Sequence, residues 1–150
     1  MKTIILTSLL LLPIITLGSD CSYPTKGMTL EQNNQYHLSL VSPKIRDKVK
    51  EVIFYLKQEG WEPRIASSKR TIACQREKVR KGYSRTMASL HLKGLAVDIV
   101  DTRYGWRGPA SKLDFKFWKD LGTAGKRAGL YWGGDWMSFK DVAHIYYIYS

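Results

Sequence analysis

The sequence is poor in cysteine, and this limits the kinds of metal site that it can form. Only two cysteines, Cys21 and Cys74, occur among its 150 residues. A structural zinc site is commonly closed by several cysteines, so a four-cysteine site is excluded. Two thiols are enough for one disulfide if the protein is exported to an oxidising compartment. The sequence leaves that pairing open, because it does not show whether the thiols come within bonding distance.

Acidic residues are also few. The chain has 13 Asp and Glu against 24 Lys and Arg, which gives a formal net charge of +11. Long-range attraction by such a charge concentrates anionic partners, among them nucleic acid, anionic lipid and acidic cell-wall polymers. The same lysines can equally serve only to keep the protein soluble. Composition therefore permits an anionic partner without choosing one.

The chain has a single long apolar run, over residues 4–17, which is shorter than the stretch of about 20 residues that spans a bilayer. Pro13 would interrupt a helix there. With Lys2 before it and Gly18 at its end, the run has the layout of a secretory signal peptide over residues 1–18. We expect cleavage after Gly18, no membrane span thereafter, and a mature protein in the periplasm, in the cell wall or outside the cell. An uncleaved anchor is the alternative. Export makes nucleic acid the weakest of the anionic partners, and none is expected.

Internal repeats and low-complexity segments are absent, and the length suits one domain with its own core. Residues 19–42 show little periodicity and are expected to form an extended lead-in to a domain over residues 43–150. Ser42 and Pro43 cap a predicted helix that ends before Gly60. Further helices are predicted over residues 71–80 and 111–128, and strands over residues 64–67, 95–101 and 144–149. The predicted fold is α+β, with a small, mainly antiparallel sheet flanked by about three helices.

Two histidines and two carboxylates fall into two short clusters. Gly94 and the β-branched residues after it argue against one helix through His91 and Asp98. A bend at Gly94 would instead bring His91 back from a loop toward Asp98, since glycine permits such bends. His144 can supply a third ligand from another strand, with Asp141 beside it. Three N and O ligands leave a fourth position open for water, as in catalytic zinc sites. Ferrous iron and ordinary hydrogen-bonded histidines are the alternatives. The remaining histidine, at position 37, is interpreted as structural or exposed.

The residues in these clusters resemble two signatures of the M15 family of zinc peptidases. The first is Ser89-x-His91-x-x-Gly94-x-Ala96-x-Asp98, and the second is Asp141-x-x-His144. The similarity also includes Arg70-Thr71, Gln75 and the stretch over residues 129–141, and it extends from about residue 43 to residue 148. Within the family the sequence is most similar to L-alanyl-D-glutamate endopeptidases of the endolysin type, with D-alanyl-D-alanine carboxypeptidases as relatives. Two signatures in the correct order are far more specific than one histidine and one aspartate.

The resemblance implies a catalytic zinc site in a cleft on the sheet. Its ligands would be His91, Asp98 and His144, which together bind one zinc ion per chain. Asp141 would be the general base, because a carboxylate within hydrogen-bond reach can take a proton from water that the metal has made more acidic.

The resemblance also assigns residues to the substrate. Arg70 would contact the substrate or the developing oxyanion as a catalytic residue, and Ser89 and Gln75 would bind substrate beside it. An exposed arginine near a helix start and a serine in a turn are the structural alternatives. Trp132 and Trp136 can line the cleft, although aromatic residues at such a junction are more often part of the core.

These assignments imply a zinc metallopeptidase that acts as a monomer on peptidoglycan, in cell-wall lysis or remodelling. Aspartate rather than glutamate as the base favours cleavage between L-alanine and D-glutamate of the stem peptide. A D,D- or L,D-carboxypeptidase of the same family is one alternative. A non-catalytic, cationic cell-wall-binding module is another, although such a module would have no need of Asp141.

Overall fold

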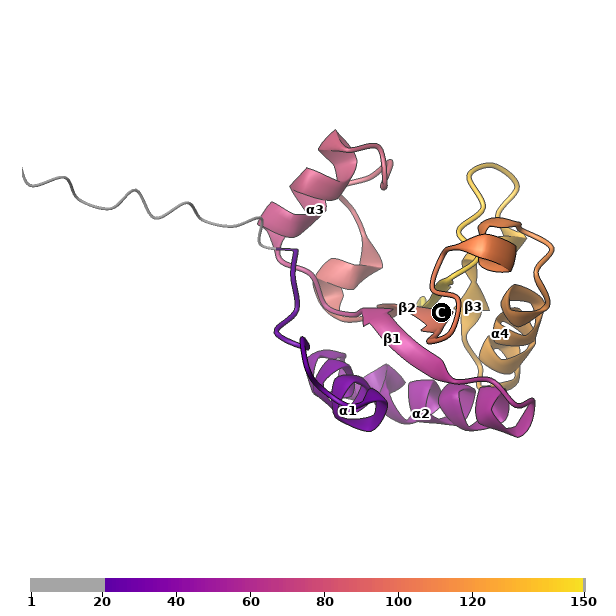
Figure 1. Cartoon of the computed structure of the whole chain (residues 1–150). Helices are drawn as coiled ribbons and strands as arrows, with labels where there is room; N and C mark the ends of the chain where they lie inside the picture. The colour runs from indigo at the N-terminus through magenta and orange to yellow at the C-terminus, as the bar shows by residue number, and fades with distance from the viewer. Residues whose placement is uncertain (1–20, 150) are drawn as a thin grey trace, which may run out of the picture.

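The computed structural model describes residues 21–149 and has an α+β fold (Figure 1). The described part of the chain contains four α-helices, which are α1 (Leu30–Leu40), α2 (Pro43–Gln58), α3 (Ile72–Arg80) and α4 (Lys116–Arg127). The strands are β1 (Pro63–Ser67), β2 (Ala96–Asp101), β3 (Tyr131–Trp132) and β4 (His144–Tyr146). Three 3-10 helices complete it, namely η1 (Leu90–Lys93), η2 (Gly108–Ser111) and η3 (Gly133–Asp135). The predicted signal peptide lies outside the described residues. None of the helices within residues 21–149 combines the length and hydropathy that crossing a bilayer requires.

The strands form one antiparallel sheet in the order β1-β2-β4-β3. β2 is an inner strand and all of its residues are buried, in agreement with its β-branched sequence. It pairs with β4 so that Asp98 lies directly opposite His144. The strand predicted over residues 144–149 ends at Tyr146, because Tyr146 lies opposite Ala96, the first residue of β2.

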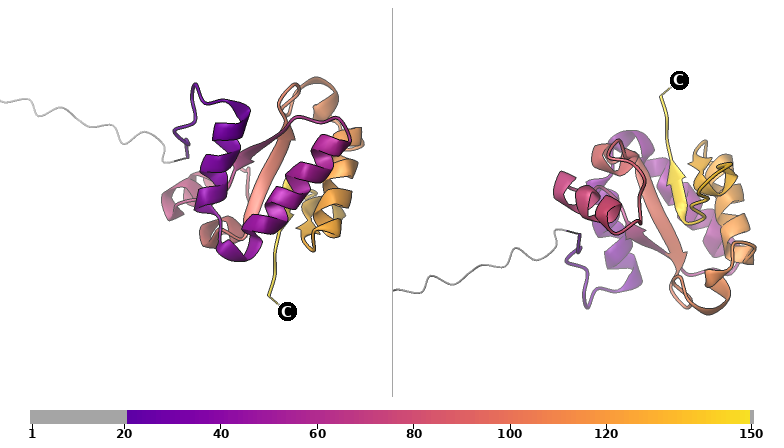
Figure 2. Two further views of the ribbon diagram at one scale, coloured as in Figure 1. Left: turned by 90° about the horizontal axis from the view of Figure 1, so that it is seen from below. Right: turned by 90° about the horizontal axis from the view of Figure 1, so that it is seen from above.

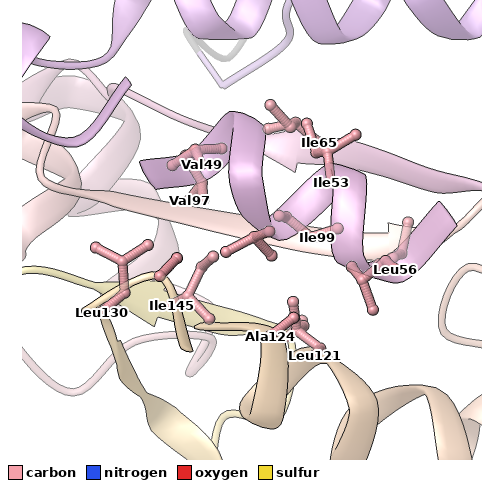
Figure 3. Packing of buried hydrophobic residues seen from close by; sticks show 14 of the residues in the cluster. Val49, Ile53, Leu56, Ile65, Val97, Ile99, Leu121, Ala124, Leu130 and Ile145 are labelled. Carbon is pink, nitrogen blue, oxygen red and sulfur yellow. The ribbon is translucent and has the colours of Figure 1, made fainter. Parts of the chain in front are cut away.

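Helices α1 and α2 lie along one face of the sheet, and α3 rises from the other face (Figures 1 and 2). Apolar residues recur along α2 at helical spacing and form a stripe that faces inward. Its five side chains are buried: Ile45, Val49, Val52, Ile53 and Leu56. Figure 3 shows side chains of α2 and α4 meeting those of β2 and β4. Full burial of each large aliphatic side chain stabilises the fold by about 1.5–3 kcal/mol.

The helix predicted over residues 111–128 begins later than expected, at Lys116. The spacing of Leu113 from Phe117 and Leu121 would place it on the apolar face of a longer helix, yet it is 58% exposed. The reason is Phe115, whose backbone is extended and whose ring packs edge-on against Trp61 and Tyr104. Packing of this ring therefore outweighs the helical pattern before it, whereas the predicted end at Gly129 is present, with a φ of +75°.

The extended lead-in predicted over residues 19–42 is wrong from residue 30 onward, where α1 forms. Thr29 and Gln32 make a reciprocal capping box at its start. Apolar periodicity is weak in this helix because its buried face is polar. Asn33 donates to the carbonyl of Ile65, while Asn34 accepts from the Ile65 N–H and donates to the carbonyl of Pro63. The two asparagines thus form hydrogen bonds with the backbone groups along one edge of β1.

His37 is buried beneath the N-terminal segment that precedes α1. Its Nδ1 lies 2.8 Å from the hydroxyl of Ser68, and the ring of Tyr23 packs edge-on against it. A disulfide joins Cys21 to Cys74, which settles the pairing that the sequence left open and ties this segment to α3. Burial, with a smaller contribution from a nearby arginine, lowers the pKa of His37 to about 4.

The lowered pKa of His37 predicts that the protein loses stability in mild acid. The unfolded chain binds a proton more readily at this histidine than the folded protein does. The contribution of His37 to the free energy of unfolding is therefore present above pH 6.5 and is lost as the pH falls toward about 4. Between pH 7 and 4.5 it amounts to about 2 kcal/mol. Urea unfolding with a chelator present should therefore show a smaller pH dependence for His37→Asn than for the wild type. Equal slopes for both proteins would contradict the assignment.

Candidate metal centre

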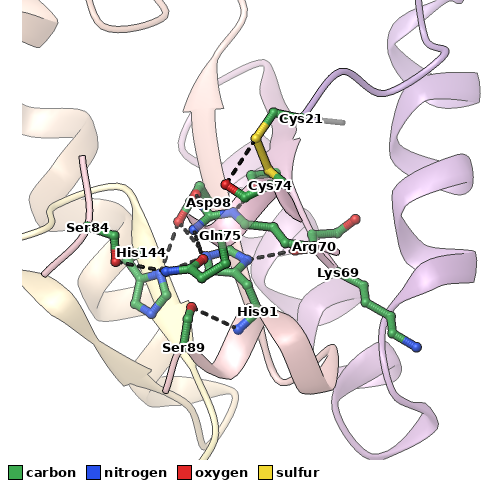
Figure 4. A network of polar contacts seen from close by, with 12 residues as sticks. Cys21, Lys69, Arg70, Cys74, Gln75, Ser84, Ser89, His91, Asp98 and His144 are labelled. Carbon is green, nitrogen blue, oxygen red and sulfur yellow. Dashed lines mark hydrogen bonds and ion pairs between the residues drawn. A yellow bond between two sulfur atoms is a disulfide. The ribbon is translucent and has the colours of Figure 1, made fainter. Parts of the chain in front are cut away.

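Three potential metal ligands converge from three separate elements. His91 lies in η1, Asp98 in β2 and His144 in β4, and all three are buried. One ligand atom from each lies within 4.8 Å of the others. The three sequence-predicted ligands are therefore brought together, as Figure 4 shows.

The bend expected at Gly94 directs His91 toward the sheet. Ser89 caps η1 by accepting a hydrogen bond from the backbone N–H of His91, and Gly94 ends it with a φ of +65°. A Cβ at Gly94 would lie 3.0 Å from the backbone nitrogen of Ser42. Both the left-handed backbone and the close approach to the start of α2 therefore favour glycine here.

The hydrogen bond on the far side of the His91 ring fixes its tautomer. Nδ1 lies 2.7 Å from the carbonyl oxygen of Ser68, which can only accept a hydrogen bond, so Nδ1 carries the hydrogen. Burial lowers the pKa of His91, which keeps the ring neutral. Nε2 is then an unprotonated donor atom directed into the site, the arrangement that metal-binding histidines commonly use.

Asp98 contacts both histidines and an arginine. One carboxylate oxygen, Oδ1, lies 3.2 Å from His91 Nε2 and 3.0 Å from His144 Nδ1. The other, Oδ2, accepts a 2.6 Å hydrogen bond from Arg70 Nη2. Burial opposes the charge, yet the hydrogen bond with His144 keeps the pKa of Asp98 well below its usual range. Asp98 is therefore an anion within the sheet.

The spacing of these donor atoms fits a small divalent cation. The unprotonated Nε2 of His91 and the Oδ1 of Asp98 are both acceptors, and they repel each other at 3.2 Å unless a cation lies between them. Nε2 is also 3.2 Å from His144 Nδ1. Tetrahedral N and O ligands at about 2.0–2.1 Å from zinc are separated by about 3.3 Å, so three such atoms match a zinc site with one open position.

Asp141 is held near the ligands by a close approach of two loops. Its N–H donates to the carbonyl of Gly133, and its own carbonyl accepts from His144 N–H. A Cβ at Gly133 would lie 2.5 Å from the Asp141 carbonyl oxygen, so a side chain there would push this turn away. Burial and the charge of Asp98 raise the pKa of Asp141, while His144 and Arg70 partly offset the effect.

A cavity of about 690 Å³ opens above the cluster. Six of the seven sequence-predicted site residues line it, namely Arg70, Ser89, His91, Asp98, Asp141 and His144. Gln75 does not line it and is fully buried. Its Oε1 accepts from Arg70 Nη1, and its Nε2 donates to Ser84 Oγ and the Thr86 carbonyl. Gln75 therefore supports Arg70 and the loop over residues 82–89 from behind.

Of the two tryptophans that the sequence offered for the cleft, Trp136 lines the cavity, whereas several other cavity residues were not identified from the sequence. Trp136 donates through Nε1 to the hydroxyl of Tyr146, whose ring stacks on His144. Tyr146 follows His144 by two positions on one strand, and strand periodicity alone could have placed both on one face. Trp132 packs against the core, with its Nε1 donating to the Val142 carbonyl. Lys78, Tyr83, Arg85, Trp106 and Phe139 have no such sequence signal.

Comparison with known proteins agrees with this arrangement. The M15 family model described as D-alanyl-D-alanine carboxypeptidase matches residues 82–147, which include all three ligands and Asp141. The chain is 32% identical over 104 residues to the L-alanyl-D-glutamate peptidase of Listeria phage A118. That match covers 67% of this chain but only 36% of the phage protein, so the chain spans about a third of its relative.

Two solved structures share the fold. The L-Ala D-Glu endopeptidase ChiX of Serratia marcescens has a TM-score of 0.58 at 24% identity, over 77% of this chain and 86% of that chain. A variant of the vancomycin resistance D,D-pentapeptidase VanY, solved in complex with Zn(II), has a TM-score of 0.53 at 20% identity, over 73% of each chain. The family match, the phage relative and the convergent cluster of two histidines and one aspartate lead to one conclusion: the chain belongs to the M15 family of metallopeptidases.

Proposed function

We propose that the protein is a zinc-dependent peptidase that hydrolyses the bond between L-alanine and D-glutamate in the stem peptides of peptidoglycan. One observation carries the proposal. The buried cluster of His91, Asp98 and His144 and the adjacent Asp141 open into the same cavity. This arrangement supports metal-dependent peptide hydrolysis, which needs a bound metal, a proton acceptor and space for a peptide side by side.

In the proposed mechanism His91, Asp98 and His144 hold one zinc ion, which when bound polarises the scissile carbonyl and increases the acidity of water. Asp141 accepts a proton from the attacking water and delivers it to the nitrogen of the departing amine. Its raised pKa suits the second transfer, because the carboxyl group must carry the proton between the two steps. Water thus supplies the hydroxyl group of the new carboxyl terminus and the proton of the new amine.

Arg70 and Ser89 are proposed to contact the substrate. Hydrogen bonds within residues 21–149 occupy three of the five N–H groups of Arg70, and the others are available to a substrate oxygen. Ser89 accepts from the N–H of His91, and its own hydroxyl hydrogen can be donated into the cavity. Gln75, proposed earlier to bind substrate, is better suited to positioning Arg70, since its side chain is buried.

Two observations support the choice of bond. The phage relative is named an L-alanyl-D-glutamate peptidase, and the proposed base is aspartate, as in the endolysin-type enzymes that the sequence resembles. A D,D-carboxypeptidase is the second candidate, because the family description over residues 82–147 names that activity. The two activities release different products from the same stem peptide.

We also propose that the protein acts outside the cytoplasm as a monomer, in the periplasm or at the cell wall. The disulfide between Cys21 and Cys74 supports an oxidising compartment. The net charge of +11 supports attraction to the acidic polymers of the wall.

Digestion of purified peptidoglycan tests the metal and the bond together. We expect release of peptides that begin with D-glutamate, loss of this release with a chelator, and its recovery on adding zinc. Product masses identify the bond. Release of D-alanine alone would instead establish the carboxypeptidase, and digestion unaffected by chelation would rule out the metal mechanism.

Substitutions distinguish the role of the proposed base from the role of the potential metal ligands. Asp141→Asn should retain zinc but lose at least about a hundredfold in the rate of hydrolysis, since general base catalysis contributes about 10²–10⁴. His91→Ala should lose both zinc and activity. Asp135→Asn is the matched control, because Asp135 is an exposed aspartate of the same region that pairs with Lys126. Zinc content and hydrolysis are measured for each. Full activity of Asp141→Asn would overturn the proposed mechanism, and wall binding without hydrolysis by the wild type would favour the binding module.

A further inference from the structure

Two cations in the cavity have no role in the metal centre. Three basic side chains line the cavity, and they are Arg70, Lys78 and Arg85. Its two carboxylates are Asp98, already engaged by Arg70 and the histidines, and Asp141. A bound divalent metal would add further positive charge. The cavity therefore has an excess of positive charge that its own carboxylates do not balance.

Lys78 is the more deeply placed of the two cations. It is half-buried, and it forms no ion pair with any residue in the described range 21–149. The carboxylate of the nearby Glu77 forms ion pairs with Arg80 and Lys81 instead, at 2.7 and 3.1 Å. The Lys78 ammonium lies over the ring of Tyr83, with the ring centroid 5.4 Å away. Burial and the neighbouring Arg70 lower the pKa of Lys78, and the charge of Asp98 offsets this only in part.

The backbone around Lys78 is fixed. Its carbonyl accepts from the N–H groups of Tyr83 and Ser84, at 2.9 and 3.2 Å. Ser84 Oγ in turn accepts from Gln75, the residue that also holds Arg70. The end of α3 and the loop over residues 82–89 are thus joined, so the backbone that carries Lys78 is fixed at the cavity before any ligand arrives. A fixed backbone reduces the conformational freedom that is lost when Lys78 binds an anion.

Arg85 lies on the same loop, and its guanidinium stacks 4.3 Å from the ring centroid of Phe139. Phe139 belongs to the loop before Asp141 and also lines the cavity. This contact joins the loop over residues 82–89 to the segment that carries the proposed base. Arg85 is exposed, and it also lacks an ion pair with any residue from 21 to 149.

We propose that Lys78, assisted by Arg85, binds a free carboxylate on the substrate residue next to the scissile bond. The inference rests on the proposed peptidase function and assigns recognition of the glutamate carboxylate to two side chains. Glutamate in a peptide keeps one carboxylate free whichever of its two carboxyl groups continues the chain. That free carboxylate would balance the charge of Lys78 and Arg85, which the carboxylates of the cavity leave unpaired. A charge-assisted hydrogen bond to Lys78 would favour a carboxylate over a neutral amide.

A matched pair of peptides tests the proposal. The zinc-loaded protein is given a stem peptide with D-glutamate after L-alanine and the same peptide with that free carboxylate converted to a carboxamide. We expect a kcat/KM roughly tenfold or more higher for the carboxylate peptide, since hydrogen bonds to charged groups contribute about 1.5–3 kcal/mol. Lys78→Met should remove most of this preference through KM, and Lys78→Arg should retain it.

Lys81→Met is the control, because it removes the same charge from the end of α3 while leaving Arg80 to pair with Glu77. It should leave the preference unchanged. Unchanged preference in Lys78→Met with normal zinc content, or equal cleavage of both peptides by the wild type, would overturn the carboxylate site and leave the peptidase function standing. If neither peptide is cleaved, the peptidase function fails instead. Calorimetric binding of the two peptides to the wild type and Lys78→Met then tests the carboxylate site by itself.

Discussion

The carboxylate of Asp98 lies in the inner strand of the sheet, where an isolated charge would be very unfavourable. Its two oxygens are met by two imidazoles and one guanidinium, at 2.6–3.2 Å. Because removing one member of a buried ionic group leaves the others uncompensated, these residues depend on one another. The backbone register supports the same arrangement, since it sets His144 directly opposite Asp98 across β2 and β4.

Hydrogen bonds of the residues around this carboxylate connect it to distant parts of the chain. On one side, the Ser68 carbonyl fixes the His91 ring, and the Tyr23 hydroxyl accepts from the Ser68 N–H. The disulfide at Cys21 thus fastens a segment that supports a potential ligand from behind. On the other side, Arg70 connects Asp98 to Gln75 and so to the loop over residues 82–89. The ligand side of the site is therefore braced by buried bonds, while its substrate side is formed by a loop.

The sequence predicted those parts of the structure whose physical cause is local. The stripe of α2 and the bend at Gly94 follow from apolar spacing and glycine geometry, and both are present. Helix α1 was missed because most of its inward face is polar, since Asn33, Asn34 and a histidine bond to β1 and Ser68. The hydrogen bond from His91 to the Ser68 carbonyl could not be predicted from the sequence, since every residue type carries the same backbone carbonyl.

The positive charge of the chain bears on the proposed function in two ways, and one of them depends on local imbalance. Most charged residues lie on the surface, where pairs such as Lys50 with Asp47 contribute little and salt screens them. Inside the cavity, screening is weaker, and the two carboxylates belong to the metal centre. The charge that remains there, on Lys78 and Arg85, is presented to whatever enters. We therefore propose that attraction to the wall and selection of a peptide are separate consequences of the same composition. The first would depend on the net charge of the whole chain, and the second on two side chains placed by the end of α3 and by the loop over residues 82–89.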